Sequence, residues 1–177
     1  MRLDSLKKHL VPYSMVSRRR TTINHAFAVA VAPFDSYDQR VARAAIGLLG
    51  QNPDSDLTCA YCGERGETWD HVNATVKDSR FSGHGHRIGN LLPCCKVCNS
   101  TKGGKTWVAY MELLKERVGY EARRSAIERY LQAFSTVDVV SDSVTGVREL
   151  EVIRLKVLSL LEEGDQLAAR IRAAHPG

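Results

Sequence analysis

Two short stretches decide the fold of this chain: Cys59-Ala60-Tyr61-Cys62 and Cys95-Lys96-Val97-Cys98. A Cys-x2-Cys turn can present two thiolates to one tetrahedral ion, and two such turns complete a four-sulfur zinc site. Cys95 follows Cys62 by 33 positions, a longer gap than an ordinary zinc ribbon has. We therefore predict that Cys59, Cys62, Cys95 and Cys98 bind one structural Zn²⁺, and that the loop they close contains further function.

Composition sets wide limits around this site. The chain has 177 residues, of which 44% are apolar, and a net charge of +5, so a folded core is expected and nucleic-acid binding is permitted. Four of its five cysteines fall into the two pairs, which in a reducing compartment favours a metal over disulfides and leaves Cys94 as a packing residue. We expect no signal peptide, no membrane span and a cytoplasmic protein.

The segment between the cysteine pairs carries its own chemical groups. Residues 67–72 read as a short strand that holds Asp70 and His71. A glycine-rich loop follows over residues 77–89, and residues 90–93 read as the return strand. The second cysteine pair then leads into a short helix that ends at Gly103-Gly104. The predicted order is strand, loop, strand and helix, held together by zinc.

The order Cys-x2-Cys, Asp-His, Asn, Cys-x2-Cys-Asn, Lys-Gly resembles the HNH nuclease family, whose fold is the ββα-metal motif. The resemblance covers about residues 57–107. It implies that His71 is the general base, that Asn90 is the central asparagine, and that Asp70 and Asn99 hold a catalytic Mg²⁺ or Mn²⁺. The loop with His84, Gly85, His86 and Arg87 has no fixed counterpart in that pattern.

The residues support hydrolysis of a phosphodiester without the family name. A histidine can take a proton from water near neutral pH, and a divalent ion held by oxygen ligands can stabilise the leaving oxygen. Asp70 and His71 are adjacent, so on a regular strand their side chains point to opposite faces, and both serve one site only if the strand is distorted or the helix wraps onto its edge. We expect the Asn90 amide to bind loop carbonyls and so to fix the histidine.

Several basic residues are candidates for DNA contact, each with a plainer alternative. The N-terminal residues 1–20 are either a basic arm along phosphates or a solvated terminus. Lys102 and Lys105 either contact phosphates or are solvated. His86 and Arg87 either grip a phosphate or belong to an exposed loop. The predicted DNA contacts are Arg18, Arg19, Arg20, His86, Arg87, Lys102 and Lys105.

The regions outside the zinc loop read as helical. We expect a helical region over residues 1–56, with a helix from Asp35 or Ser36 to Leu49 and a helix at 21–33, for which a strand is the alternative. We also expect a C-terminal helical region over 108–177. In the latter we expect helices at 106–118, over the segment containing Ile127, and at 147–173, with a β-branched connection at 135–145. The last helix has a heptad pattern that predicts either a homodimer or packing on the same chain. Its apolar positions are Leu150, Ile153, Val157, Leu160, Gly164, Leu167 and Ile171.

Together these features predict an α+β protein with a zinc-pinned ββα-metal core, residues 57–107, inside mostly helical extensions. The function that the resemblance implies is a restriction-like endonuclease that cuts double-stranded DNA and leaves 5′-phosphate and 3′-hydroxyl ends. The alternative is a zinc-ribbon-like module that binds nucleic acid without cutting it. The set Asp70, His71 and Asn99 distinguishes the two, because a binding module has no need of it.

Overall fold

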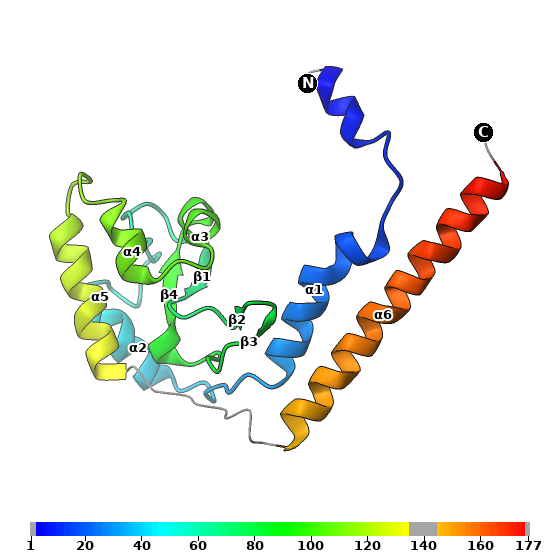
Figure 1. The fold of residues 1–177 in the computed structure, drawn as a ribbon. Coiled ribbons are helices and arrows are strands. Elements are labelled where there is room, and N and C mark those ends of the chain that lie inside the picture. The colour runs from blue at the N-terminus through cyan, green and yellow to red at the C-terminus, as the bar shows by residue number, and fades with distance from the viewer. Residues whose placement is uncertain (1–2, 135–144, 176–177) are drawn as a thin grey trace. The chain divides into compact units, whose positions relative to one another are not determined.

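A computed structural model describes residues 3–134 and 145–175 of the chain (Figure 1). Over these residues the fold is α+β, with long helices and two small antiparallel sheets of two strands each. The chain divides into two compact units, one formed by Met1–Phe27 with Asp142–Gly177 and the other by Ala28–Ser141. The boundaries predicted at residues 56 and 107 do not coincide with this division, because helices on both sides of the zinc loop belong to its unit.

The first unit is built on an antiparallel pair of helices. It contains η1 (Leu3–Lys8), most of α1 (Met15–Ala30) and α6 (Thr145–Ala174). The Asp165 carboxylate caps the start of α1 by accepting from the backbone N–H of Met15 at 2.7 Å and of Val16 at 3.2 Å. Further along the pair, buried Arg154 donates to the side-chain oxygen of buried Asn24. The start of α1 thus lies beside the C-terminal half of α6, and the two helices run antiparallel.

The second unit holds the remaining elements, and the paired strands β1 and β4 lie at its centre (Figure 1). In β1–β4, Trp69 faces Pro93 and His71 faces Leu91, while β2 pairs with β3 in a small hairpin. The helix α3 follows β4 directly and packs on β1 through the contacts of Lys102. The elements are α2 (Gln39–Leu48), β1 (Thr68–His71), β2 (Val76–Lys77), β3 (Arg80–Phe81), η2 (Ile88–Asn90), β4 (Leu91–Cys94), α3 (Lys96–Lys102), α4 (Trp107–Glu112) and α5 (Tyr120–Phe134).

One apolar core joins these helices to the cysteine cluster. Ile46 of α2, Met111 of α4 and Ile127 of α5 are buried in the same cluster as the cysteines. Tyr61, in the first cysteine turn, and Leu92 of β4 are fully buried at its centre. The flanking helices therefore supply apolar surface that a segment of residues 57–107 alone would lack.

The helix boundaries differ from the predicted ones in three places. The helix α1 begins at Met15, inside the segment read as a basic arm. The helix α2 begins at Gln39, because the Asp38 side chain caps it by accepting from the N–H of Arg40 and Val41. The helix α4 ends at Glu112 rather than near residue 118.

Two further expectations concern the connection at residues 135–145 and the absence of a membrane span. The predicted connection at residues 135–145 lies outside the described residues, except that α6 begins at Thr145. Among the helices in the described ranges, none has both the length and the apolar character that crossing a bilayer requires.

Candidate functional site

The four predicted cysteine ligands converge on one point. Their sulfur atoms all lie within 4.8 Å of one another, and the Sγ atoms of Cys62 and Cys95 are 3.7 Å apart. Four thiolates about 2.3 Å from a tetrahedral Zn²⁺ would lie about 3.8 Å from each other. The residues therefore fit a structural zinc ion, and this part of the prediction is confirmed as a four-cysteine cluster that could hold such a metal.

Local backbone geometry explains why the first cysteine turn holds this shape. Gly63 has a φ of 82°, which a residue without a Cβ adopts at no steric cost, and its N–H donates to the Cys59 carbonyl at 2.9 Å. In the second turn, Cys95 caps α3, and its sulfur accepts from the N–H of Cys98 at 3.4 Å. Both turns thus direct a pair of sulfur atoms toward one centre.

Cys94 has a contact that its reading as a packing residue did not include. It is fully buried, and its sulfur lies 3.9 Å from the Cys59 sulfur, within hydrogen-bonding distance for two sulfur atoms. That hydrogen bond is the main reason that the pKa of Cys59 is lowered to about 4. A thiolate is the form that binds a metal, so Cys94 favours the state of Cys59 that a zinc site needs.

Asp70 and His71 point to opposite sides of β1, as a regular strand requires. Asp70 is 4% exposed, and its carboxylate accepts from the Tyr61 hydroxyl at 2.6 Å. It also forms an ion pair with Lys102, with 3.0 Å between Oδ2 and Nζ. Burial raises the pKa of Asp70, and the bonds from Tyr61 and Lys102 partly offset that rise. This carboxylate therefore supports the interior rather than an exposed ion.

Lys102 is a structural residue in this arrangement. It is 1% exposed, and besides Asp70 its ammonium donates to the His71 carbonyl at 2.8 Å. The structure therefore corrects the prediction that Lys102 contacts a DNA phosphate, because the ammonium is buried and already bonded to Asp70 and His71. Its position instead ties the last turn of α3 to the strand that carries His71.

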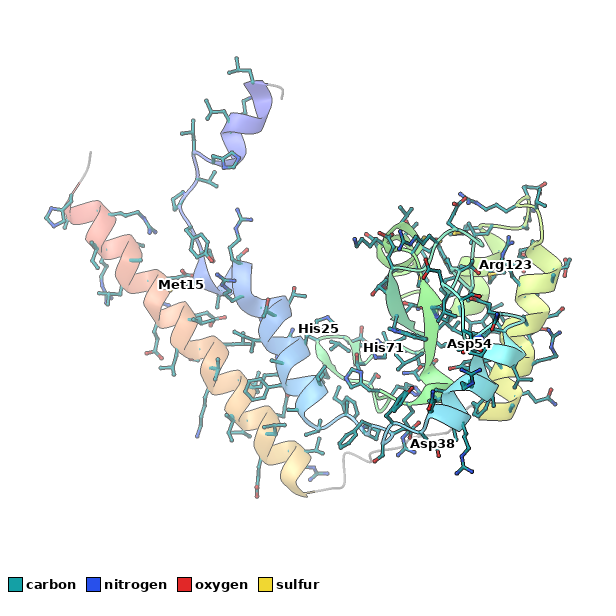
Figure 2. The ribbon with its side chains drawn as sticks, turned by 180° about the vertical axis from the view of Figure 1, so that it is seen from behind. Met15, His25, Asp38, Asp54, His71 and Arg123 are labelled. Atoms are coloured by element: carbon teal, nitrogen blue, oxygen red, sulfur yellow. The ribbon has the colours of Figure 1, made fainter. Side chains whose placement is uncertain are left out.

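His71 lies at the end of β1 (Figure 2), and its ring contacts a second histidine. Its Nε2 is 2.9 Å from Nδ1 of His86, and the two rings are tilted at 66°. One nitrogen of such a pair must carry hydrogen and the other must accept it. His86 thus joins the candidate catalytic residue as a direct partner, a role that the sequence pattern did not indicate.

The backbone around His86 is held against the segment that precedes α2. The N–H of His86 donates to the Pro33 carbonyl at 2.8 Å, and its carbonyl accepts from the N–H of Asp35 at 3.3 Å. A Cβ on Gly85 would lie 1.9 Å from the Pro33 oxygen, so only glycine permits this approach. The loop between β3 and η2 therefore presents His86 to His71 from a fixed backbone.

Asn90 binds both ends of the loop between the strands, as we expected of its amide. Its oxygen accepts from the N–H of Asn73 at 2.8 Å, and its nitrogen donates to the carbonyls of Asn73 and Gly85 at 3.0 and 2.9 Å. Asn90 is 7% exposed. It therefore fixes the chain just after His71 and just before His86, and so sets the distance between the two histidines.

The predicted ligands of a catalytic ion lie on two elements, Asp70 on β1 and Asn99 on α3. Asn99 is half-buried in α3, whereas both oxygens of Asp70 contact Lys102 or Tyr61. Over residues 3–134 and 145–175, the one group of three or more histidine, cysteine or acidic residues close enough to hold an ion is the four-cysteine cluster. Asp70 and Asn99 do not fit a Mg²⁺ or Mn²⁺ site in this arrangement.

The other predicted DNA contacts differ in exposure. Arg18 and Arg19 are exposed on α1, while Arg20 forms a surface ion pair with Glu162 at 3.2 Å. Lys105 is exposed, and its ammonium donates to the Thr101 carbonyl. Arg87 is half-buried, with its Nε 4.0 Å from Asp35. Arg18, Arg19 and Lys105 are thus the members of the predicted set whose charges are most open to solvent.

An apolar pocket of about 340 Å³ adjoins the histidine pair, because His86 forms part of its wall. Three aromatic residues line it: Tyr37, Trp69 and Tyr130. Tyr37 is 83% exposed and Trp69 is 50% exposed, so both rings are accessible to a ligand beside the site. Exposed aromatic rings of this kind can stack on nucleic-acid bases.

Sequence reasoning missed Tyr61 and gave Lys102 and His86 other roles than the contacts they make in the structure, because the local signals were weak. Lys102 was read as either a phosphate contact or a solvated cation because its partner Asp70 is 32 positions away along the chain. Tyr61 was visible only as a residue between two cysteines. His86 stood in a glycine-rich loop, and the glycine at position 85 was the one sign that a close backbone approach occurs there.

Comparison with known proteins adds no assignment: no protein-family model, curated protein or solved structure matches this chain.

Proposed function

We propose that this protein is a zinc-stabilised, HNH-type endonuclease that hydrolyses phosphodiester bonds in double-stranded DNA, with His71 as the general base. The observation that carries the proposal is the His71–His86 contact at 2.9 Å, at the end of a strand next to a four-cysteine cluster. A cysteine cluster that served only to stabilise a binding module would not call for two histidines held in register by a buried asparagine.

His71 can act as a base because its ring is half-buried on the outer side of β1. In the proposed reaction an imidazole nitrogen of His71 accepts a proton from the attacking water, whose oxygen forms a bond to phosphorus while the bond to the 3′ oxygen breaks. The His86 ring fixes the orientation of the His71 ring and can share the added proton. Site-specific, restriction-like cutting with 5′-phosphate and 3′-hydroxyl products is the biology we propose.

A catalytic divalent ion is part of the family resemblance, and a bound Mg²⁺ or Mn²⁺ would supply charge stabilisation to the leaving oxygen. Asp70 and Asn99 do not fit that ion, since the Asp70 carboxylate is enclosed with Lys102. No step of the proposed reaction is therefore assigned to these two residues.

Plasmid nicking tests the proposal. The purified chain, incubated with supercoiled DNA and either Mg²⁺ or Mn²⁺, should produce nicked and linear forms. The variant His71→Ala should cut about 10²–10⁴ times more slowly, the usual range for losing a general base, with unchanged zinc content and DNA affinity. His25→Ala is a matched control, because His25 is exposed on α1 (Figure 2). Cleavage by His71→Ala at the unmodified rate would rule out this assignment.

One observation favours the second candidate, a zinc-stabilised module that binds nucleic acid without cutting it. The buried ion pair of Asp70 removes the carboxylate that distinguished the two functions in the sequence. Binding of DNA with no cleavage under any divalent ion would support this second candidate and reject the first.

A further inference from the structure

The helix α6 has one face that α1 covers and another that is open to solvent. On the covered side, the Met15 Cε atom lies 2.7 Å from the place where a Cβ of Gly164 would be, so the glycine admits the methionine. Leu158 and Arg154 on this side are 4% and 6% exposed. The glycine in the heptad pattern is therefore explained by packing within the chain, and does not interrupt an intermolecular seam.

The heptad pattern divides between these two sides. Of the four alternate positions that begin at Leu150, three are half-buried, namely Leu150, Val157 and Gly164, and the last, Ile171, is 55% exposed. The positions between them form an exposed stripe: Ile153 is 50% exposed, Leu160 is 64% exposed and Leu167 is 51% exposed. Residues seven apart lie almost above each other on a helix, so this stripe is a continuous apolar line on the outside of the helix pair.

A row of alternating charges runs beside the exposed stripe, about 40–60° around the helix from it. The row consists of exposed residues at the same spacing of seven: Glu149, Lys156, Glu163 and Arg170. The charge is negative, positive, negative and positive along the row. A surface with one apolar line and one alternating charged line can be complementary to a copy of itself.

The spacing fixes how such a copy would lie. The midpoint of Lys156 and Glu163 coincides with the midpoint of Glu149 and Arg170, and Leu160 is the midpoint of Ile153 and Leu167. The two midpoints differ by half a residue, or about 0.75 Å along a helix. One two-fold axis beside Leu160 would therefore place opposite charges together and apolar residues together in an antiparallel pair.

A parallel pair is disfavoured by the same surface. In a parallel pair, the two-fold axis runs along the helices. The apolar stripe of one copy then lies against the charged row of the other. Charged groups would then lose water without gaining an opposite charge. In the antiparallel pair each row meets its own counterpart.

We propose that the chain forms an antiparallel, two-fold symmetric homodimer through this outer face of α6. Leu160 packs on Leu160 of the second copy, and Ile153 packs on its Leu167. Lys156 pairs with Glu163 of the second copy, and Glu149 pairs with its Arg170. This interface is independent of the proposed nuclease function, and it differs from the seam predicted from the sequence because the half-buried positions take no part in it.

Charge exchange tests the register on the full chain with zinc bound. The unmodified protein should sediment as a dimer at micromolar concentrations. Lys156→Glu and Glu163→Lys should each weaken the dimer, since each creates two like-charge pairs, whereas the double variant should restore it. Arg129→Glu, an equal change of charge at an exposed position of α5, is the control and should leave the dimer intact.

Leu160→Arg tests the apolar line, and it should give a folded monomer because Leu160 is already 64% exposed. Cysteine cross-linking tests the direction. Leu160→Cys should form a disulfide with its own copy on mild oxidation, whereas Ile153→Cys should do so only when mixed with Leu167→Cys. A monomeric unmodified protein, a dimer that survives Leu160→Arg, or a double charge exchange that fails to restore association would each overturn the proposal.

Discussion

Asp70 and Lys102 form an ion pair at 3.0 Å in which the side chains are 5% and 1% exposed. The pair joins β1 to α3, and the same ammonium binds the carbonyl of His71. Asp70, which the sequence pattern assigned to a catalytic ion, thus instead helps to hold the strand that carries His71, the candidate base. Its surroundings determine the first prediction.

Removing one member of this pair should destabilise the second unit strongly. Lys102→Met leaves the Asp70 carboxylate buried without its counter-charge, which typically lowers the free energy of unfolding by about 3–5 kcal/mol. Urea unfolding followed by tryptophan fluorescence measures the change. Lys105→Met is the matched control, since Lys105 is exposed, and should change stability by less than about 0.5 kcal/mol. Equal effects for the two lysines would contradict the structural role of Lys102.

Metal analysis should find one zinc ion per chain, bound by the four-cysteine cluster. Cys59→Ser and Cys98→Ser should lose the ion and unfold the second unit, because binding of a structural metal is part of the folding free energy. Cys94→Ala should keep the ion, since the Cys94 sulfur is not among the four that converge. Zinc retained at full content in Cys59→Ser would argue against this ligand set.

Loss of the second histidine should slow cleavage without abolishing it. His86→Ala removes the partner of His71, and losing a group that orients a functional side chain typically costs about 10- to 100-fold in activity. His84→Ala changes a histidine in the same loop and provides the comparison. Single-turnover cleavage distinguishes them, and similar rates for both variants would show that the 2.9 Å contact has no part in the reaction.

Asn90→Ala should loosen the loop that carries His86. It removes three hydrogen bonds at 2.8, 2.9 and 3.0 Å, and leaves buried backbone groups unsatisfied at a cost of about 1–3 kcal/mol each. Hydrogen exchange should quicken in residues 73–87. Asn90→Asp keeps the acceptor for the Asn73 N–H but loses both donated bonds, so its exchange should be intermediate. Protection equal to the unmodified chain in both variants would refute this.

Acid should weaken the capping of α1. The pKa of Asp165 is lowered, mainly because its carboxylate accepts from the Met15 N–H. A group with a lowered folded-state pKa contributes stability above its unfolded-state value, near about 3.9, and loses it as the pH falls through the folded-state value. At neutral pH, hydrogen exchange at the start of α1 should be faster in Asp165→Asn than in the unmodified chain. The difference should shrink below about pH 3.9. A difference that is independent of pH would contradict the role of the charge.

The sequence by itself determined which four cysteines converge on one possible metal site, and the main strands and helix of that segment. Cys-x2-Cys spacing constrains sulfur positions locally, so Cys59, Cys62, Cys95 and Cys98 could be assigned without knowledge of the rest of the fold. β-Branched and aromatic residues likewise placed β1, and the heptad pattern placed α6, because strand and helix preferences depend on neighbours along the chain. That the Asn90 amide binds loop carbonyls was also predicted, from its place at the start of the return strand.

Only the tertiary structure decided which groups meet across distant segments. The Asp70–Lys102 pair, the His71–His86 contact and the cover that α1 gives to one side of α6 each join residues that no local pattern relates. Each depends on burial and on the direction of a side chain after packing, and these are fixed by the whole core. A charged residue therefore reads the same in the sequence whether it is solvated, as Lys105 is, or enclosed, as Lys102 is.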